Sequence, residues 1–206
     1  MDRTYTSRDL ARIACAACEG CGVCCRGMGE SILLDPYDAD RLSKSLKKPF
    51  AEMIEHEAAL IIDRGMILPH IVMREETDAC SFLGADGRCQ IHRDRPGICR
   101  LYPLGRTYED DQVRYFILDG SCKVPGKVKV RISRWLEIPD IDRYERFKLE
   151  WHIFTRKIQD RLEYEEDEGE MKRINMFLIK TFYFNPYGDD FYSEFSERLD
   201  KVQRLF

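Results

Sequence analysis

The sequence contains no apolar run of about 18 residues, which is the length that a membrane-spanning helix requires. Its first residues, Met1 to Arg8, also lack the apolar core of a secretory signal peptide. There is no dense run of Lys and Arg, and the formal net charge is −4, whereas binding to nucleic acid requires a basic face. We therefore expect a cytoplasmic protein that binds neither membranes nor nucleic acid.

The motifs of several common cofactor folds are missing as well. No G-x-G-x-x-G follows a strand-like segment, so a Rossmann-type dinucleotide or methyltransferase site has no support. Residues 120–128 are only superficially similar to a phosphate-binding loop. That segment is one residue too long, and Val128 stands where Ser or Thr would hold Mg²⁺. No catalytic residue can be assigned from such motifs.

Cysteine is abundant in the first part of the chain and absent after residue 122. Five of the nine cysteines lie within residues 15–25, namely Cys15, Cys18, Cys21, Cys24 and Cys25. Packing does not require thiols at every third position, whereas a soft metal ion or an iron–sulfur cluster needs several converging thiolates. A secreted disulfide scaffold is the alternative, but the cysteine count is odd and no export signal is present. The sequence therefore predicts a metal centre.

A second group of cysteines lies downstream, at Cys80, Cys89 and Cys99. Asp86-Gly87 predicts a tight turn that brings Cys80 and Cys89 together, and residues 95–97 predict another turn before Cys99. These three thiolates, folded onto the first loop, supply enough ligands for two sites.

Several residues near these groups have alternative interpretations. Cys122 either completes a four-cysteine set or is a free, buried cysteine, and Cys15 is either a ligand or a small buried residue. His92 is a further candidate, although a lone histidine in a turn is seldom a ligand. Because neighbouring side chains diverge, we expect Cys24 and Cys25 to bind different metals or different irons of a cluster.

Arginine side chains interleave with the second cysteine group, at Arg93, Arg95 and Arg100. Their charge can offset that of a thiolate cluster or bind an anionic ligand. Ordinary ion pairs are the alternative. We predict Arg95 and Arg100 as cofactor-binding residues.

The pattern Cys18-x2-Cys21-x2-Cys24-Cys25 is followed by Cys80, Cys89 and Cys99, with Arg95-Pro96 and Arg100-Leu101-Tyr102-Pro103 around the last cysteine. This combination resembles the CxxCxxCC family of zinc- or iron-chelating domains, the YkgJ-type cysteine-cluster proteins, over about residues 15–122. The resemblance implies that these seven cysteines are the family's metal-binding positions, and we add Cys122 as a predicted ligand.

The same domain is found in flagellin lysine N-methylases, so the resemblance also implies a [4Fe–4S] cluster, S-adenosylmethionine and a protein substrate such as flagellin. Two functions remain open. One is an iron–sulfur protein that takes part in S-adenosylmethionine-dependent methylation of protein lysine. The other is a non-catalytic zinc- or iron-binding protein with a structural or metal-carrier role.

The expected fold is α+β and mainly helical, with an irregular cysteine-rich metal-binding core, a small β-hairpin and C-terminal helices. We predict a metal-binding domain at 1–135 and a helical region packed on it at 136–206. Apolar residues at steps of three and four predict a helix over 141–162. The other expected elements are helices at 8–17, 36–46, 50–63, 174–182 and 191–206, an extended segment at 66–74, and a hairpin of 101–108 with 113–118.

Overall fold

The computed structural model describes residues 3–14, 21–120, 122 and 125–205. Its fold is α+β and mainly helical, which confirms the predicted class. The helices are α1 (Pro36–Leu46), α2 (Gly97–Leu101), α3 (Ile132–Leu136), α4 (Ile141–Glu163), α5 (Glu168–Ile179) and α6 (Phe191–Gln203). Shorter turns are the 3-10 turns η2 (Val23–Cys25), η3 (Phe50–Met53) and η4 (His92–Asp94), and the π-helical turn η5 (Lys180–Phe184).

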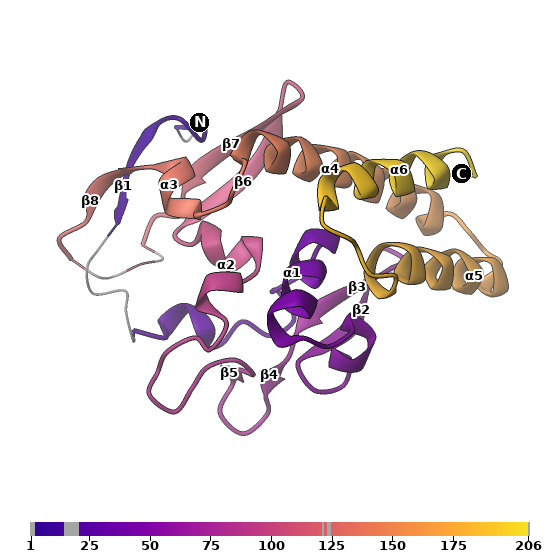
Figure 1. Cartoon of the computed structure of the whole chain (residues 1–206), viewed down its shortest axis with the longest axis horizontal. Helices are drawn as coiled ribbons and strands as arrows, with labels where there is room; N and C mark the ends of the chain where they lie inside the picture. Colours follow the sequence, from indigo (N-terminus) through magenta and orange to yellow (C-terminus); the bar gives the residue numbers. More distant parts are fainter. Residues whose placement is uncertain (1–2, 15–20, 121, 123–124, 206) are drawn as a thin grey trace.

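The strands of the described residues form antiparallel pairs rather than one large sheet (Figure 1). The pairs are β1 (Leu10–Ala14) with β8 (Val128–Arg131), β2 (Ala58–Asp63) with β3 (Met66–Ile71), β4 (Met73–Arg74) with β5 (Ala79–Cys80), and β6 (Leu104–Glu109) with β7 (Gln112–Ile117). The hairpin of β6 and β7 was predicted, although Leu101 belongs to α2 and not to its first strand.

Two predicted helices are wrong because strand pairing replaces them. In the first, residues 10–14 form β1, which pairs with β8 more than a hundred residues later in the chain; residues 15–17 lie outside the described residues. In the second, only Phe50–Met53 is helical, and Ala58–Asp63 pairs with β3 through a turn at Arg64 and Gly65, both with positive φ. Tertiary pairing overrides the local helix propensity at both places.

Helix α1 begins where the sequence predicts. The side chain of Asp35 accepts a hydrogen bond from the backbone N of Asp38, and the side chain of Asp38 accepts one from the backbone N of Asp35. Pro36 occupies the first helical position, where its missing N–H costs nothing. This reciprocal cap fixes the direction in which α1 leaves the cysteine-rich part of the chain.

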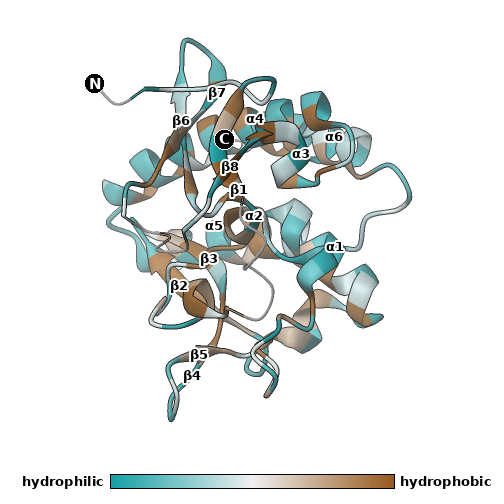
Figure 2. Ribbon diagram, turned by 90° about the vertical axis from the view of Figure 1, so that its left-hand side faces the viewer, coloured by the Kyte–Doolittle hydropathy of each residue, from teal (hydrophilic) through white to brown (hydrophobic). Residues whose placement is uncertain are grey.

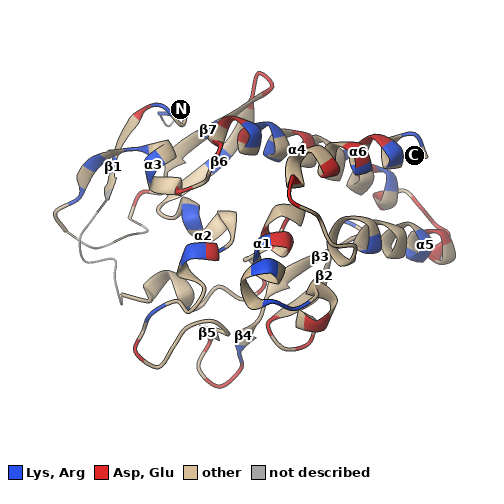
Figure 3. Ribbon diagram, viewed as in Figure 1, with Lys and Arg blue, Asp and Glu red and all other residues tan. Residues whose placement is uncertain are grey.

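The predicted apolar stripe on α4 is buried except at its first residue, Ile141, which is half-buried at the start of the helix. The buried members are Tyr144, Phe147, Trp151, Phe154, Ile158 and Leu162. Hydrophobic and hydrophilic stretches alternate along α4 and α6 (Figure 2), and the acidic segment between α4 and α5 forms an exposed turn (Figure 3). Aromatic contacts tie the C-terminal helices to the N-terminal half, because Tyr37 packs on Phe147 and Phe50 packs on Tyr183.

Candidate metal centre

Three separate segments deliver the described cysteines to one region. Turn η2 carries Cys24 and Cys25, β5 ends at Cys80, and α2 carries Cys99. Between them, the chain turns back so that Cys89 pairs with Leu83, and the N–H of Gly84 donates to the carbonyl of Arg88 at 2.8 Å. The predicted turn at Asp86-Gly87 is confirmed, and it brings Cys89 back towards Cys80.

The first cysteine loop lies directly on the second. Gly22, with φ of +60°, precedes η2, and a Cβ atom on it would lie 3.3 Å from the carbonyl oxygen of Gly87. On the other side of η2, the N–H of Gly27 donates to the carbonyl of Asp78 at 2.9 Å. The start of η2 therefore lies close to the turn between Cys80 and Cys89, and the segment after η2 is hydrogen-bonded to the turn just before β5.

The thiols of five cysteines influence one another electrostatically. The Cys25 thiol donates a hydrogen bond to Cys24, which lowers the pKa of Cys24 to about 6 and raises that of Cys25. Burial raises the pKa of Cys99, and the charges of Asp38, Cys80, Cys89 and Cys24 raise it further. Burial also raises the pKa values of Cys80 and Cys89. The structure thus gathers Cys24, Cys25, Cys80, Cys89 and Cys99 into one cluster.

The adjacent pair Cys24 and Cys25 lies in a tight 3-10 turn. This turn, Val23–Cys25, is closed by a 3.1 Å hydrogen bond from the N–H of Cys25 to the carbonyl of Gly22. The two thiols shift each other's pKa in opposite directions, downward for Cys24 and upward for Cys25. The assignment of the pair to different metals or to different irons of a cluster stays a prediction.

The donor set fits a thiophilic metal by its chemistry. All seven cysteines of the described residues are free thiols, and Zn²⁺, Fe²⁺ and iron–sulfur clusters all bind thiolates. Within the described part of the chain, no three His, Cys, Asp or Glu side chains already have the spacing of metal ligands. Binding must therefore draw the cysteine segments closer together.

Two other predicted ligands among the described residues, Cys21 and Cys122, are not part of this cluster of five. Cys21 is exposed and Cys122 is half-buried, and neither is among the main electrostatic neighbours of the five thiols. Cys15 and Cys18 fall outside the described residues. The His92 ring lies within hydrogen-bonding distance of the Arg95 guanidinium, 2.8 Å from Nε2 to Nη1.

The two predicted cofactor-binding arginines have different environments. Arg100 is buried, and its guanidinium donates to the carbonyls of Arg93, Arg95, Leu136 and Glu137. Arg95 forms an ion pair with Glu137 at 3.5 Å; its charge contributes to the lowered pKa of Cys24 and opposes the rise that burial causes in the pKa of Cys89. Arg95 is thus a cation near the thiols of Cys24 and Cys89, as Arg74 is near that of Cys80, and cofactor binding by Arg95 or Arg100 stays a prediction.

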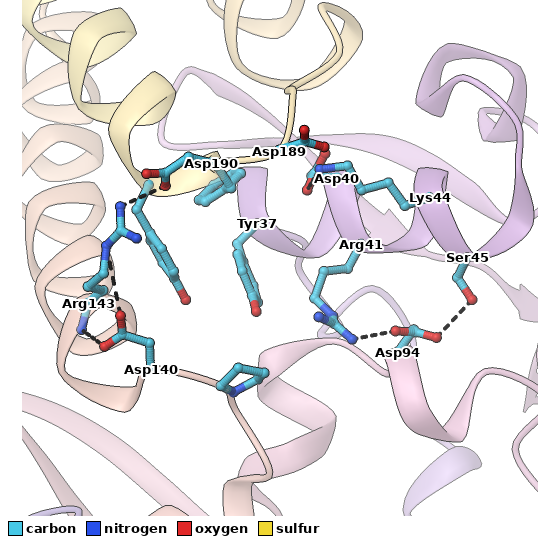
Figure 4. A pocket seen from close by; sticks show the side chains of 13 residues that line it. Tyr37, Asp40, Arg41, Lys44, Ser45, Asp94, Asp140, Arg143, Asp189 and Asp190 are labelled. Atoms are coloured by element: carbon cyan, nitrogen blue, oxygen red, sulfur yellow. Dashed lines mark hydrogen bonds and ion pairs between the residues drawn. The ribbon is translucent and has the colours of Figure 1, made fainter.

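A polar cavity of about 550 Å³ lies beside the segment that joins Cys89 to Cys99 (Figure 4). Its lining comes from α1, η4, and the segments at the start of α4 and α6. Arg41 pairs with Asp94, and Arg143 pairs with Asp190 at 2.7 Å. The rings of Tyr37 and Tyr192 stack in its wall, with 5.5 Å between their centres. The lining residues are far apart in sequence and form no motif, so sequence reasoning missed the cavity.

Fold and site together are those of a cysteine-rich α+β protein whose thiols are free. A sequence model of the CxxCxxCC family, described as a "putative zinc- or iron-chelating domain", matches residues 17–123. The match covers just over half of the chain and includes every cysteine from Cys18 to Cys122. The chain belongs to this family.

No curated protein and no solved structure matches the chain. Within the described residues, no helix has both the length and the apolar character needed to cross a membrane.

Proposed function

We propose that this chain is a cytoplasmic protein that holds zinc, iron or an iron–sulfur cluster in the thiolate cluster described above. The observation that carries the proposal is the convergence of Cys24, Cys25, Cys80, Cys89 and Cys99 from three segments. Cys18 and Cys21 complete the set of seven by family resemblance, and Cys122 is a further candidate. Such a set supplies soft, anionic ligands, and Arg95 would offset part of their charge.

An iron–sulfur centre is the form that we favour. A single Zn²⁺ takes four thiolates. The five clustered cysteines together with Cys18 and Cys21 offer seven. The surplus supports a polynuclear centre or a second metal. Bound metal would also stabilise the irregular segments around the cysteines, because thiolate–metal bonds couple binding to folding.

Metal analysis of anaerobically purified protein tests the proposal. We expect iron with acid-labile sulfide and visible absorption, and we expect Cys89→Ser to lose them. Gln90→Ala, on the exposed neighbouring residue, is the matched control and should keep the wild-type metal content. A colourless protein with stoichiometric zinc would show that the site holds zinc and not an iron–sulfur cluster. Metal-free wild-type protein would contradict both forms of the proposal.

The polar cavity favours a second candidate function, S-adenosylmethionine-dependent methylation of a protein lysine. Its lining has five aspartates against three basic residues, and the tyrosine rings add two aromatic faces. Negative charge and aromatic faces suit a protonated amine. In this reaction the lysine ammonium would first lose its proton to water. The amine lone pair would then form the N–CH₃ bond as the S–CH₃ bond of the sulfonium breaks, and the thioether S-adenosylhomocysteine would leave.

Incubation with methyl-labelled S-adenosylmethionine and flagellin tests this candidate. We expect label on lysine with the wild-type protein and about two- to fivefold less with Asp189→Asn, which lowers the negative charge of the cavity. If Cys122 is a ligand of the metal centre, Cys122→Ser should lower both the metal content and the methyl label; unchanged values would show that it is not. No label with the metal-loaded wild type would leave the non-catalytic role, a structural or carrier zinc or iron site, as the function.

A further inference from the structure

We propose that Asp38 is a positioning residue of the metal centre. Through the backbone of Gly97 it fixes helix α2, which carries Cys99, and an ion pair between Asp35 and Lys148 links this contact to helix α4. The inference rests on the proposed metal-binding function, and it assigns a role in that function to residues outside the cysteine motif.

Helix α2 borrows its N-terminal cap from another helix. It is five residues long, and no side chain at its own start caps it. Instead, Oδ1 of Asp38, on α1, accepts a 2.7 Å hydrogen bond from the N–H of Gly97, the first residue of α2. Asp38 is 4% exposed, so this hydrogen bond is shielded from water. Without it, a backbone donor two residues from Cys99 would be buried without a partner, which destabilises the start of α2.

The carboxylate of Asp38 is itself held in place. Its other oxygen, Oδ2, accepts from the N–H of Asp35 at 3.3 Å, and Oδ1 of Asp35 accepts from the N–H of Asp38 at 2.9 Å. Lys148 of α4 then donates to Oδ2 of Asp35 at 2.5 Å, with both side chains largely buried. A series of contacts, from Lys148 through Asp35 and Asp38 to Gly97, therefore connects helix α4 to helix α2, which carries Cys99.

The far end of α2 is held by Arg100. Its buried guanidinium joins the carbonyls at 93 and 95, just before α2, to the carbonyls of Leu136 and Glu137 at the end of α3. Figure 1 shows α2 lying between α3 and α1. Since contacts hold α2 at both ends, the position of Cys99 is set by residues outside the cysteine motif.

Affinity for a probe metal, together with amide exchange, tests the inference. The metal is Zn²⁺, measured by competition with a chromophoric chelator, and the proteins are wild type, Asp38→Ala and Asp38→Asn. Asp40→Ala is the matched control, because Asp40 is a buried aspartate of the same helix that pairs with Lys44 and not with α2. We expect Asp38→Ala to weaken binding about 10- to 100-fold, as removal of outer-shell partners does. Asp38→Asn keeps an oxygen acceptor and should stay within about threefold of wild type, as should Asp40→Ala.

Hydrogen–deuterium exchange of the metal-free proteins separates failure of this inference from failure of the proposed function. Amides of residues 97–101 should exchange faster in Asp38→Ala than in Asp40→Ala. Equal exchange in these two variants would overturn the positioning role whatever the metal data show. If wild type binds no metal but exchange differs as expected, the proposed function fails while the contact that fixes α2 stands. Equal loss of affinity in Asp38→Ala and Asp40→Ala would also overturn the inference.

Discussion

The hydroxyl of Tyr144 occupies the space in which a Cβ atom on Gly97 would lie. Tyr144 belongs to α4 and is 1% exposed, so it has no room to move away. The next atoms around that position are Cζ of Tyr144 at 3.5 Å and Oδ1 of Asp38 at 3.6 Å, which are ordinary contacts. Because this hydroxyl fills the space beside Gly97, a side chain at residue 97 would displace it. Glycine at this position therefore allows α2 to pack closely on α4.

This relationship predicts a non-additive pair of substitutions. Gly97→Ala should destabilise the protein by about 1–3 kcal/mol, because it overpacks a buried contact. Tyr144→Phe removes the oxygen, so the double variant Gly97→Ala/Tyr144→Phe should be more stable than the sum of the single effects predicts. Urea unfolding of the four proteins measures the coupling. Additive effects would show that the clash is relieved elsewhere.

Cys24 should be the most reactive buried thiol of the metal-free protein. Its pKa of about 6 results mainly from the hydrogen bond donated by Cys25, with a contribution from Arg95. Because the thiolate is the nucleophile, iodoacetamide should modify Cys24 with a midpoint near pH 6, well below that of Cys89, whose pKa burial raises. Cys25→Ala removes the donor and should shift the midpoint upward. Mass spectrometry of peptides after timed labelling gives the rates, and equal midpoints for Cys24 and Cys89 would contradict this prediction.

Asp38 should make stability depend on pH. Burial first, and then the charge of Asp35, raises the pKa of Asp38 from 3.8 to about 7, while Lys148 and the backbone of Gly97 oppose the shift. Between these values the folded protein holds a proton that the unfolded chain has released. This contribution to stability is complete below about pH 4 and is lost as the pH rises to about 7. Asp38→Asn should therefore lose less stability than wild type between pH 4 and 7. Urea midpoints of the metal-free proteins across this range test the sign, and parallel curves would contradict it.

Removal of one aromatic ring from α4 should weaken the core without touching the cysteines. Phe154 is 1% exposed and packs against Trp151 and Phe182. Phe154→Ala should cost about 3–5 kcal/mol. Its neighbour Ile153 is 50% exposed, so Ile153→Ala serves as the matched control and should change the free energy of unfolding by less than about 0.5 kcal/mol. Equal effects in the two variants would contradict the burial of the predicted stripe.

The sequence predicted those parts of the fold whose signal is local. The stripe on α4, the Asp35-Pro36 start of α1 and the turn at Asp86-Gly87 each depend on residues within one or two turns of chain, and all are present. The β1–β8 pair was missed because its partners lie more than a hundred residues apart, and a short apolar run does not distinguish a strand from a helix.

In the candidate site too, features with a local sequence signal could be predicted and long-range contacts could not. Thiol spacing identified the metal-binding segments, because few other functions require cysteine at every third position. No sequence pattern could indicate that Asp38 caps α2 or that Lys148 reaches Asp35, since each contact joins residues more than fifty positions apart. Cofactor binding by Arg100 stays a prediction, and its contacts with four backbone carbonyls could not be predicted because they depend on where α3 lies.

X-ray absorption at the zinc and iron edges of anaerobically purified protein tests the central proposal most directly. Our account predicts a first coordination shell made of sulfur, at about 2.3 Å, because the ligands are cysteine thiolates. For an iron–sulfur centre we also expect an iron–iron distance in the second shell. A first shell made only of nitrogen and oxygen, or protein that carries no metal at all, would contradict the account.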